Sequence, residues 1–480
     1  MNDPHMASAD IGFSSAESLL EGLTNRQFTS VELVNAFLER ISAIDAPDQG
    51  LNSILALNAN ALEQASVLDK SENVGPLHGL PIVIKDNIQA IGLPATAGSL
   101  ALANRPVTQD AELVARLRKA GAVILGATNL SEWANIRSSM STSGWSAVGG
   151  LTANPWKYKY SAGGSSSGSG ASVAAGLTPL AVGTETDGSI VCPASFNGCV
   201  GIKPTVGVVS RDGVVPISNS QDSPGSMARS VRDAALLLEV LSGQSGFVDV
   251  CENSDAFRVG IVGEWLSNDD QANALFADTC AVFAKAGILL SEISIPKMSE
   301  EVGEDEGTVL FHEHVEDLDA YLLTRAGSGV TSLADVIEFN SANSDDELKY
   351  FHQDYLELAA DSGGRNAKYT QARKRNLDWA LNKVLLPAIS QVDVLIGVPY
   401  GPAWLSTLGL GDDFSKAGWM THAPAIAGWP IGSIPMGLVD GLPIGLGITA
   451  RAHDEHGLIR AMSIMEKALG FGVMRPNFIR

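Results

Sequence analysis

The sequence predicts an α/β fold in which helices cover a parallel or mixed β-sheet. Two observations favour this fold: short apolar runs typical of buried strands alternate with segments of helical periodicity, and 45% of the 480 residues are hydrophobic. The charged fraction of 18% is typical of a compact globular protein. No linker interrupts the pattern, so we expect a flexible tail over residues 1–10 and a single domain over residues 11–480.

Helical periodicity appears first near the N-terminus. Thr29 and Glu32 have the spacing of a capping box, and apolar residues between positions 33 and 41 follow at helical period. A second helical pattern covers about residues 58–68. We therefore expect two helices before the first buried strand.

The first buried strand is expected at Ile82–Ile84. This apolar run is bounded by Gly-Leu-Pro on one side and Asp-Asn on the other, which predicts a strand with Lys85 at its end. Residues 112–119 then have a helical pattern, and Ala122–Leu125 form the next apolar run. Alternation of this kind predicts strands that share one sheet.

Residues 140–175 are unusually rich in Gly, Ser and Thr and contain the stretch Ser161–Gly170. Low-complexity Gly/Ser sequence often marks a flexible linker. Here the stretch runs directly into the apolar, Ala-rich segment 171–177. We therefore expect a tight loop at the start of a buried helix.

Acidic residues are concentrated in residues 299–362, which contain 17 Asp and Glu against two Lys and Arg. Such a charge run predicts a solvated, mostly helical insertion; the alternative is a lid that disfavours acidic substrates. His312 and His314 lie in this segment, and we expect them at the solvated surface rather than at a metal. Further on, strands broken by turns are expected at 392–398, 434–437 and 441–447.

Charge and cysteine content exclude several classes of partner. The net charge of −22 opposes binding to nucleic acid and to anionic membrane surfaces, because both are negatively charged.

The four cysteines form no CxxC pair, which favours reduced thiols in a cytoplasmic protein. The N-terminus has no signal-peptide pattern, and no apolar run is long enough to span a membrane.

Hydrolysis of an amide needs a nucleophile, a base and donors for the oxyanion, and three segments offer them. Burial at a strand end would lower the pKa of Lys85 and make its neutral amine a base. The loop 163–168 combines flexible glycines with hydroxyl groups, and the turn 183–193 places Gly188 directly before Ser189. Each segment alone also fits an ordinary strand end, capping loop or polar turn.

In this order and spacing, the three segments resemble the amidase signature family. The family patterns GGSSxG and GTxTxGSI match Gly163–Gly168 and Gly183–Ile190. The resemblance covers most of the chain and is densest over residues 124–235. It implies a central mixed β-sheet covered by helices on both faces, and an enzyme that cleaves linear carboxamides without a cofactor or metal.

The resemblance also implies the roles of individual residues. Lys85 matches the base, and Ser165 matches a serine on a cis peptide bond that relays the proton. Ser189 matches the nucleophile that forms the acyl-enzyme. The oxyanion hole corresponds to the backbone N–H groups of Thr186, Asp187, Gly188 and Ser189. The expected products are a carboxylic acid and ammonia or an amine.

Two positions depart from the commonest family pattern. Asp187 stands where glycine is usual, and Val191 stands where arginine is frequent. The second departure puts an ion pair between that arginine and Glu185 in doubt. The first places a carboxylate close to the nucleophile.

The variant is most similar to the bacterial peptide amidases, which remove ammonia from C-terminally amidated peptides. A small-molecule or short-peptide amide is therefore the expected substrate, with Asn135 and Asp187 near its amide group. Tyr400 and Trp404 follow a predicted strand in a Pro/Gly-rich segment and are further candidates for substrate contacts.

Other functions fit parts of the sequence. An α/β-hydrolase esterase would use Ser166 in a G-x-S-x-G pattern, with His422, His453 or His456 as its base. An aliphatic or aryl amidase, or the catalytic subunit of a tRNA-dependent amidotransferase, would share the same family. A phosphate-binding protein is disfavoured because neither of the common glycine-rich nucleotide motifs is present.

Overall fold

The computed structural model of the protein describes residues 8–46, 50–325 and 329–477. Residues 1–7 of the expected N-terminal tail lie outside these ranges. Helix α1 (Ser8–Phe13) begins at Ser8, so the prediction of a tail is wrong for residues 8–10.

Within the described chain, eleven strands form one mixed β-sheet in the order β1-β3-β2-β6-β8-β7-β12-β13-β11-β9-β10. The strands are β1 (Ile54–Leu57), β2 (Pro81–Lys85), β3 (Val123–Thr128), β6 (Leu180–Glu185), β7 (Val200–Lys203), β8 (Ser223–Ala228), β9 (Arg258–Val262), β10 (Leu289–Ile293), β11 (Val394–Gly397), β12 (Ile431–Val439) and β13 (Leu442–Ala450). β2 pairs parallel with β3 and β6, and β9 pairs parallel with β10 and β11. The other pairs are antiparallel. A separate small sheet consists of β4 (Trp145–Ser146) and β5 (Gly150–Leu151).

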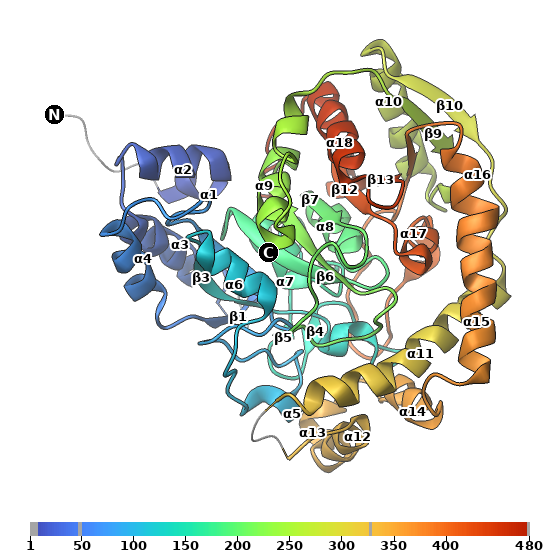
Figure 1. Cartoon of the computed structure of the whole chain (residues 1–480), viewed down its shortest axis with the longest axis horizontal. Helices are drawn as coiled ribbons and strands as arrows, with labels where there is room; N and C mark the ends of the chain where they lie inside the picture. Colours follow the sequence, from blue (N-terminus) through green and yellow to red (C-terminus); the bar gives the residue numbers. More distant parts are fainter. Residues whose placement is uncertain (1–7, 47–49, 326–328, 478–480) are drawn as a thin grey trace.

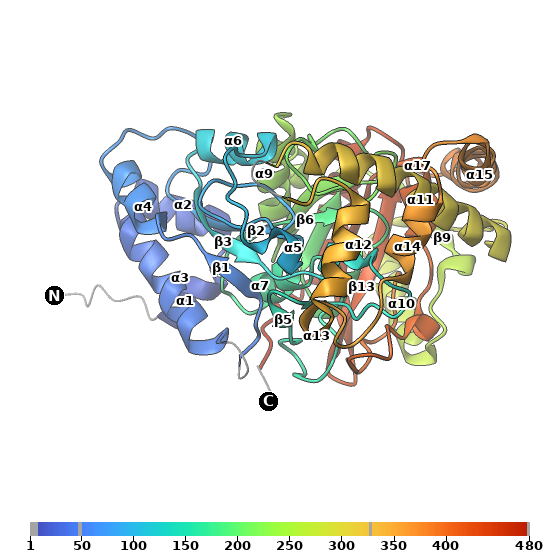
Figure 2. The same ribbon diagram turned by 90° about the horizontal axis from the view of Figure 1, so that it is seen from below.

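Helices surround this sheet (Figure 1). They are α2 (Ala16–Thr24), α3 (Ser30–Ile44), α4 (Ala61–Asp69), α5 (Leu100–Ala103), α6 (Glu112–Lys119), α7 (Ser167–Ala174), α8 (Val191–Asn197), α9 (Val231–Ser242), α10 (Asp270–Lys285), α11 (Glu300–Leu322), α12 (Leu333–Ala342), α13 (Ser344–Glu347), α14 (Asp354–Asp361), α15 (Ala367–Leu377), α16 (Leu386–Ile389), α17 (His422–Ala427) and α18 (Glu455–Leu469). Both views place α1 to α4 beside one end of the sheet and α10 beside the other (Figures 1 and 2). In the described ranges, no helix combines the length and apolar character needed to cross a membrane.

The two faces of the sheet are covered by different helices. A Cβ at Gly432 of β12 would lie 2.5 Å from the sulfur of Met462 in α18. On the opposite face, a Cβ at Gly445 of β13 would lie 2.8 Å from Ser195 in α8. Glycine at these positions therefore lets both helices approach the sheet closely.

Several predicted elements are confirmed. Thr29 and Glu32 form a capping box at the start of α3. The fully buried strand β2 ends at Lys85, and α6 has the predicted bounds. The Gly/Ser stretch leads into α7, whose residues are all buried.

The C-terminal apolar runs differ from the prediction. They form two continuous strands, β12 and β13, joined in a hairpin, instead of strands broken by turns. The register shifts between Pro435 and Gly437, so a bulge accommodates the proline within the strand.

The acidic segment is mostly helical, as predicted, but the expectation that it is solvated is wrong for several of its side chains. Glu306, Glu313 and Glu347 are at most 5% exposed. His312 and His314 are also buried, and burial lowers the pKa of His314 to about 4. A count of charges does not reveal that the fold surrounds these carboxylates with hydrogen-bond donors.

Candidate active site

The carboxyl ends of β2 and β6 bring the first two site segments together. The strands run parallel, with Ile84 paired to Val182, so Lys85 and Thr184 lie at the same edge of the sheet. Ligands of α/β proteins commonly bind beyond such strand ends.

Lys85 is fully buried at this edge. Its Nζ lies 2.7 Å from the Oγ of Ser165, 2.8 Å from the Oγ1 of Thr184 and 3.2 Å from the carbonyl oxygen of Thr184. Burial disfavours the ammonium and lowers the pKa of Lys85 to about 7, although the charges of Asp222 and Glu185 act in the opposite direction. The neutral amine is therefore well populated near neutral pH.

Ser165 and Ser189 lie on neighbouring loops. The Gly164–Ser165 peptide bond is cis. The backbone N–H of Ser166 donates to the carbonyl oxygen of Ser189 at 3.1 Å, which joins the two loops directly. Ser165 is 1% and Ser189 9% exposed, so both hydroxyls are sheltered from bulk water.

The turn that contains Ser189 is shaped by Glu185 and Gly188. One carboxylate oxygen of Glu185 accepts hydrogen bonds from the N–H groups of Ile190 and Val191 at 2.7 and 2.9 Å. Gly188 has a φ of 78°, and a Cβ there would collide with the hydroxyl of Tyr400. These contacts turn the backbone so that α8 begins two residues after Ser189.

The doubt about an arginine partner for Glu185 is resolved by this geometry. Among the described residues, the carboxylate forms no ion pair with an arginine and is held by the two N–H groups instead. Burial raises the pKa of Glu185, while the positive charge of the buried Lys203 lowers it. Val191 therefore binds Glu185 through its backbone N–H, whereas an arginine at this position would bind Glu185 through its side chain.

Asp187 is held by a charged cluster. The Nδ1 of His422 contacts the Oδ2 of Asp187 and lies 3.2 Å from the Oε2 of Glu306. Burial disfavours the imidazolium, but the two carboxylates outweigh this effect and hold the pKa of His422 well above its ordinary value. The other Asp187 oxygen, Oδ1, is buried without a hydrogen-bond partner in the described structure.

These three side chains also have the composition of a metal site. Their candidate ligand atoms all lie within 4.8 Å of one another. A protonated imidazole is not a metal ligand, so a cation would bind only after His422 lost its proton. The ion-pair arrangement accounts for the same contacts without a metal.

Thr186 is fixed from the other side of the turn. Its Oγ1 donates to the Oδ1 of Asp222 at 2.6 Å, and the Oδ2 of Asp222 accepts from the N–H groups of Ile217 and Ser218 at 2.8 and 2.9 Å. Burial raises the pKa of Asp222 to about 6. The turn 186–189 is therefore held at two successive side chains.

The segment after β11 carries the remaining candidates. Phe196 of α8 packs against the rings of Tyr400 and Trp404, with centroid separations of 5.9 and 4.9 Å. The amide of Asn135 lies 3.4 Å from Asp412 in the same segment. All four predicted substrate contacts thus lie in or beside this segment or the turn 186–189.

Ser166 is not placed as the nucleophile of an α/β-hydrolase. It is fully buried, donates to the carbonyl oxygen of Thr184 at 3.0 Å and accepts from the N–H of the same residue at 3.2 Å. His422 contacts Asp187 and Glu306, while His456 contacts the carbonyl of Ser245. The hydroxyl of Ser166 therefore has a structural role that needs no histidine.

Sequence reasoning missed Thr184, Asp222 and Glu306, and it considered His422 only as the base of an α/β-hydrolase. Thr184 lies inside the motif that contains Ser189, so its position was a usable signal. Asp222, Glu306 and His422 come from other elements, and their local sequence gives no sign of the contact.

Comparison with known proteins identifies the family. The Amidase family model matches residues 32–459 of the chain. The chain belongs to the amidase signature family. It is accordingly a hydrolase that acts on amides.

The relatives of this amidase have names that indicate different activities. A protein named "Probable amidase" from Arabidopsis thaliana is 34% identical, with 95% of this chain and 91% of the relative covered. A glutamyl-tRNA(Gln) amidotransferase subunit from Methanosarcina mazei is also 34% identical, with 94% and 96% covered.

Solved structures include close matches to this amidase. The native peptide amidase from Stenotrophomonas maltophilia is 38% identical, with a TM-score of 0.89 and coverage of 97% of this chain and 99% of that chain. A peptide amidase in complex with the competitive inhibitor chymostatin has the same identity and coverage and a TM-score of 0.92. The fold is thus the amidase signature fold, a large mixed sheet with helices.

Proposed function

We propose that this amidase cleaves linear carboxamides through an acyl-enzyme, with Ser189 as nucleophile, Ser165 as proton relay and Lys85 as base. The observation that carries the proposal is the 2.7 Å contact between Lys85 and Ser165 inside the protein. A lysine whose pKa is lowered to about 7 supplies a neutral amine where a serine needs a base.

The hydrogen bonds of Lys85 fit a neutral amine. Such an amine has two N–H donors and one lone pair. The two donors are satisfied by the carbonyl oxygen and the Oγ1 of Thr184, at 3.2 and 2.8 Å. The lone pair is then left for the hydroxyl proton of Ser165.

The proposed reaction proceeds in two halves. Lys85 takes a proton from Ser165 as Ser165 takes one from Ser189, and the Ser189 oxygen bonds to the amide carbon. The backbone N–H groups of Thr186, Asp187, Gly188 and Ser189 stabilise the resulting oxyanion. The relay returns the proton to the leaving nitrogen, the C–N bond breaks, and ammonia or an amine departs. Water then attacks the acyl-enzyme by the same route, releasing the acid and restoring Ser189. The mechanism needs no metal or organic cofactor.

We further propose that the substrates are C-terminally amidated short peptides. Two observations support this substrate class: the similarity to solved peptide amidases over nearly the whole chain, and the carboxylate of Asp187 two residues before the nucleophile. The net charge of −22 makes nucleic acid an unsuitable partner.

A second candidate is the catalytic subunit of an amidotransferase. The similarity to the glutamyl-tRNA(Gln) amidotransferase protein of Methanosarcina mazei favours it. Such a protein would release ammonia from glutamine and pass it to a partner subunit.

Ammonia release from a panel of amides tests both proposals. The panel contains an amidated dipeptide, a simple aliphatic amide, glutamine and an anilide. Hydrolysis of the anilide is measured as release of aniline instead of ammonia. We expect the isolated protein to prefer the amidated dipeptide, and Ser189→Ala and Lys85→Ala to be inactive. Full activity of Ser189→Ala would overturn the mechanism. A preference for the aliphatic amide or the anilide would overturn the substrate class, and activity on glutamine that requires a partner would favour the amidotransferase.

A further inference from the structure

The acidic helix α11 presents a row of carboxylates to the loop 217–222. Glu306, Glu313 and Asp317 are separated by seven and four residues, which places them on one side of the helix. They are 5%, 1% and 8% exposed, so the row faces protein rather than solvent.

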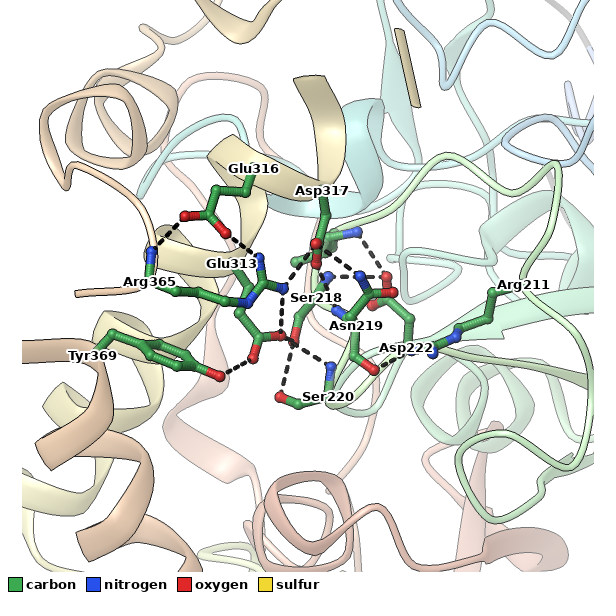
Figure 3. A network of polar contacts seen from close by, with 11 residues as sticks. Arg211, Ser218, Asn219, Ser220, Asp222, Glu313, Glu316, Asp317, Arg365 and Tyr369 are labelled. Carbon is green, nitrogen blue, oxygen red and sulfur yellow. Dashed lines mark hydrogen bonds and ion pairs between the residues drawn. The ribbon is translucent and has the colours of Figure 1, made fainter. Parts of the chain in front are cut away.

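Two of these carboxylates hold the loop through its backbone and side chains (Figure 3). Glu313 accepts hydrogen bonds from the hydroxyl of Ser218 at 2.5 Å and from the N–H of Ser220 at 2.9 Å. Asp317 accepts from the N–H and the side-chain amide of Asn219 at 2.8 and 2.7 Å. The loop is therefore fixed at three consecutive residues.

Side chains at and near the start of α15 contact two carboxylates of this row. Arg365 forms an ion pair with Asp317 at 2.7 Å, and the hydroxyl of Tyr369 donates to Glu313 at 2.7 Å (Figure 3). Because the carboxylates are satisfied from both sides, the row has one defined geometry.

Two connections lead from α11 to the turn 186–189, here called the oxyanion turn because its N–H groups are proposed to stabilise the oxyanion. Glu306 contacts His422, which contacts Asp187, and Glu306 also accepts from Gln221 at 2.9 Å. The second connection runs through the loop 217–222 to Asp222, which holds Thr186 at 2.6 Å. Both connections end on residues whose N–H groups are assigned to the oxyanion hole.

We propose that His422, Glu306 and Glu313 are positioning residues that hold the oxyanion turn in its productive geometry. The inference rests on the proposed function, because it assumes that the turn 186–189 stabilises the oxyanion. In this arrangement, the acidic segment is a structural part of the active site. None of the three residues needs to touch the substrate.

A turn that stabilises only the transition state affects kcat more than KM. Loss of one oxyanion donor costs about 100- to 1000-fold in kcat, so a loosened turn should cost about 10- to 100-fold. The variants His422→Gln, Glu306→Gln and Glu313→Gln remove the charged contacts and retain similar size. The matched control is Glu304→Gln, an exposed residue on the same helix.

Steady-state kinetics on an amidated dipeptide test the proposal, with Ser189→Ala measured in parallel. We expect the three variants to lose kcat while KM changes less than about threefold, and the Glu304→Gln control to match wild type. Inhibition by a peptide aldehyde, whose serine adduct carries a tetrahedral oxyanion, should weaken in proportion to kcat. Circular dichroism checks that each variant is folded. One folded variant among the three is sufficient for the comparison with wild type.

The outcomes separate the possible failures. If Ser189→Ala is inactive but all three variants keep wild-type kcat, the positioning role is wrong and the proposed function stands. If Ser189→Ala is active, the proposed function itself fails. A rise in KM with unchanged kcat would make these residues part of substrate binding, and inactivation by EDTA that zinc reverses would make His422 a metal ligand. Either result overturns the positioning role.

Discussion

Lys85 and Ser165 stand 80 positions apart in the sequence, and their side chains are hydrogen bonded at 2.7 Å. Lys85 ends a core strand, while Ser165 lies in the loop before α7, so the contact forms only when sheet and loop are packed together. The burial that creates the contact also lowers the pKa of Lys85, because the same packing excludes water. Position and basicity therefore have one physical cause.

The first prediction concerns pH. Only the neutral amine of Lys85 accepts a proton, and its pKa is lowered to about 7. We expect kcat/KM on an amidated dipeptide to be low below this pKa, to rise as pH increases through about 7, and to level off above it. Lys85→Arg should lose about 100-fold or more at every pH, because the guanidinium does not deprotonate. An arginine variant with a wild-type pH profile would exclude Lys85 as the base.

The second prediction concerns Gly188. Alanine at this position would have to adopt a φ of 78° and would place its Cβ against the hydroxyl of Tyr400. We expect Gly188→Ala to lose about 100-fold or more in kcat, because displacement of the turn misplaces its N–H groups. The double variant with Tyr400→Phe should recover part of the loss, since the collision is removed and the backbone strain remains. Equal activities of the single and double variants would show that the collision is unimportant.

The third prediction separates Ser166 from Ser165 and Ser189, the two serines proposed to be catalytic. Ser166→Ala leaves the buried N–H of Thr184 without its partner, which should lower the free energy of unfolding by about 1–3 kcal/mol. The variant should retain most of its activity, because Ser165 and Ser189 are unchanged. Urea denaturation and ammonia release measure the two effects on the same preparation. Inactivity with wild-type stability would instead support Ser166 as a nucleophile.

Local sequence pattern was sufficient to predict three structural features of the site, whereas the roles of Lys85, Ser165 and Ser189 were implied only by the resemblance to the amidase signature family. Lys85 follows three apolar strand formers, and Ser165 and Ser189 lie in short glycine-rich motifs, so strand end, loop and turn were predictable from neighbouring residues. The charged cluster was not predictable, because His422 and Asp187 are 235 positions apart. The acidic segment was misjudged for the same reason: its composition is that of a solvated surface, whereas Glu313 is 1% exposed. Burial of a charge depends on donors that other segments provide.

The last prediction concerns Arg137, which joins the acidic segment to the loop beside the site. Arg137 is fully buried, with one guanidinium nitrogen 2.6 Å from Glu132 and 3.7 Å from the carboxylate of Glu347. Removal of the guanidinium leaves two buried carboxylates without their cation. We expect Arg137→Leu to lower the free energy of unfolding by about 3–5 kcal/mol.

Glu347→Gln is the matched comparison for Arg137→Leu. Glutamine keeps an acceptor for the hydroxyl of Ser99 and the N–H of Leu100, which bind Glu347 at 3.0 and 2.7 Å. Burial raises the pKa of Glu132, Arg137 lowers it, and the negative charge of Glu347 raises it further. Glutamine at position 347 removes that negative charge. We therefore expect a much smaller loss of stability, below about 1.5 kcal/mol, in urea denaturation at neutral pH. Equal losses in the two variants would mean that hydrogen bonding and packing, rather than charge balance, hold the acidic segment against the site.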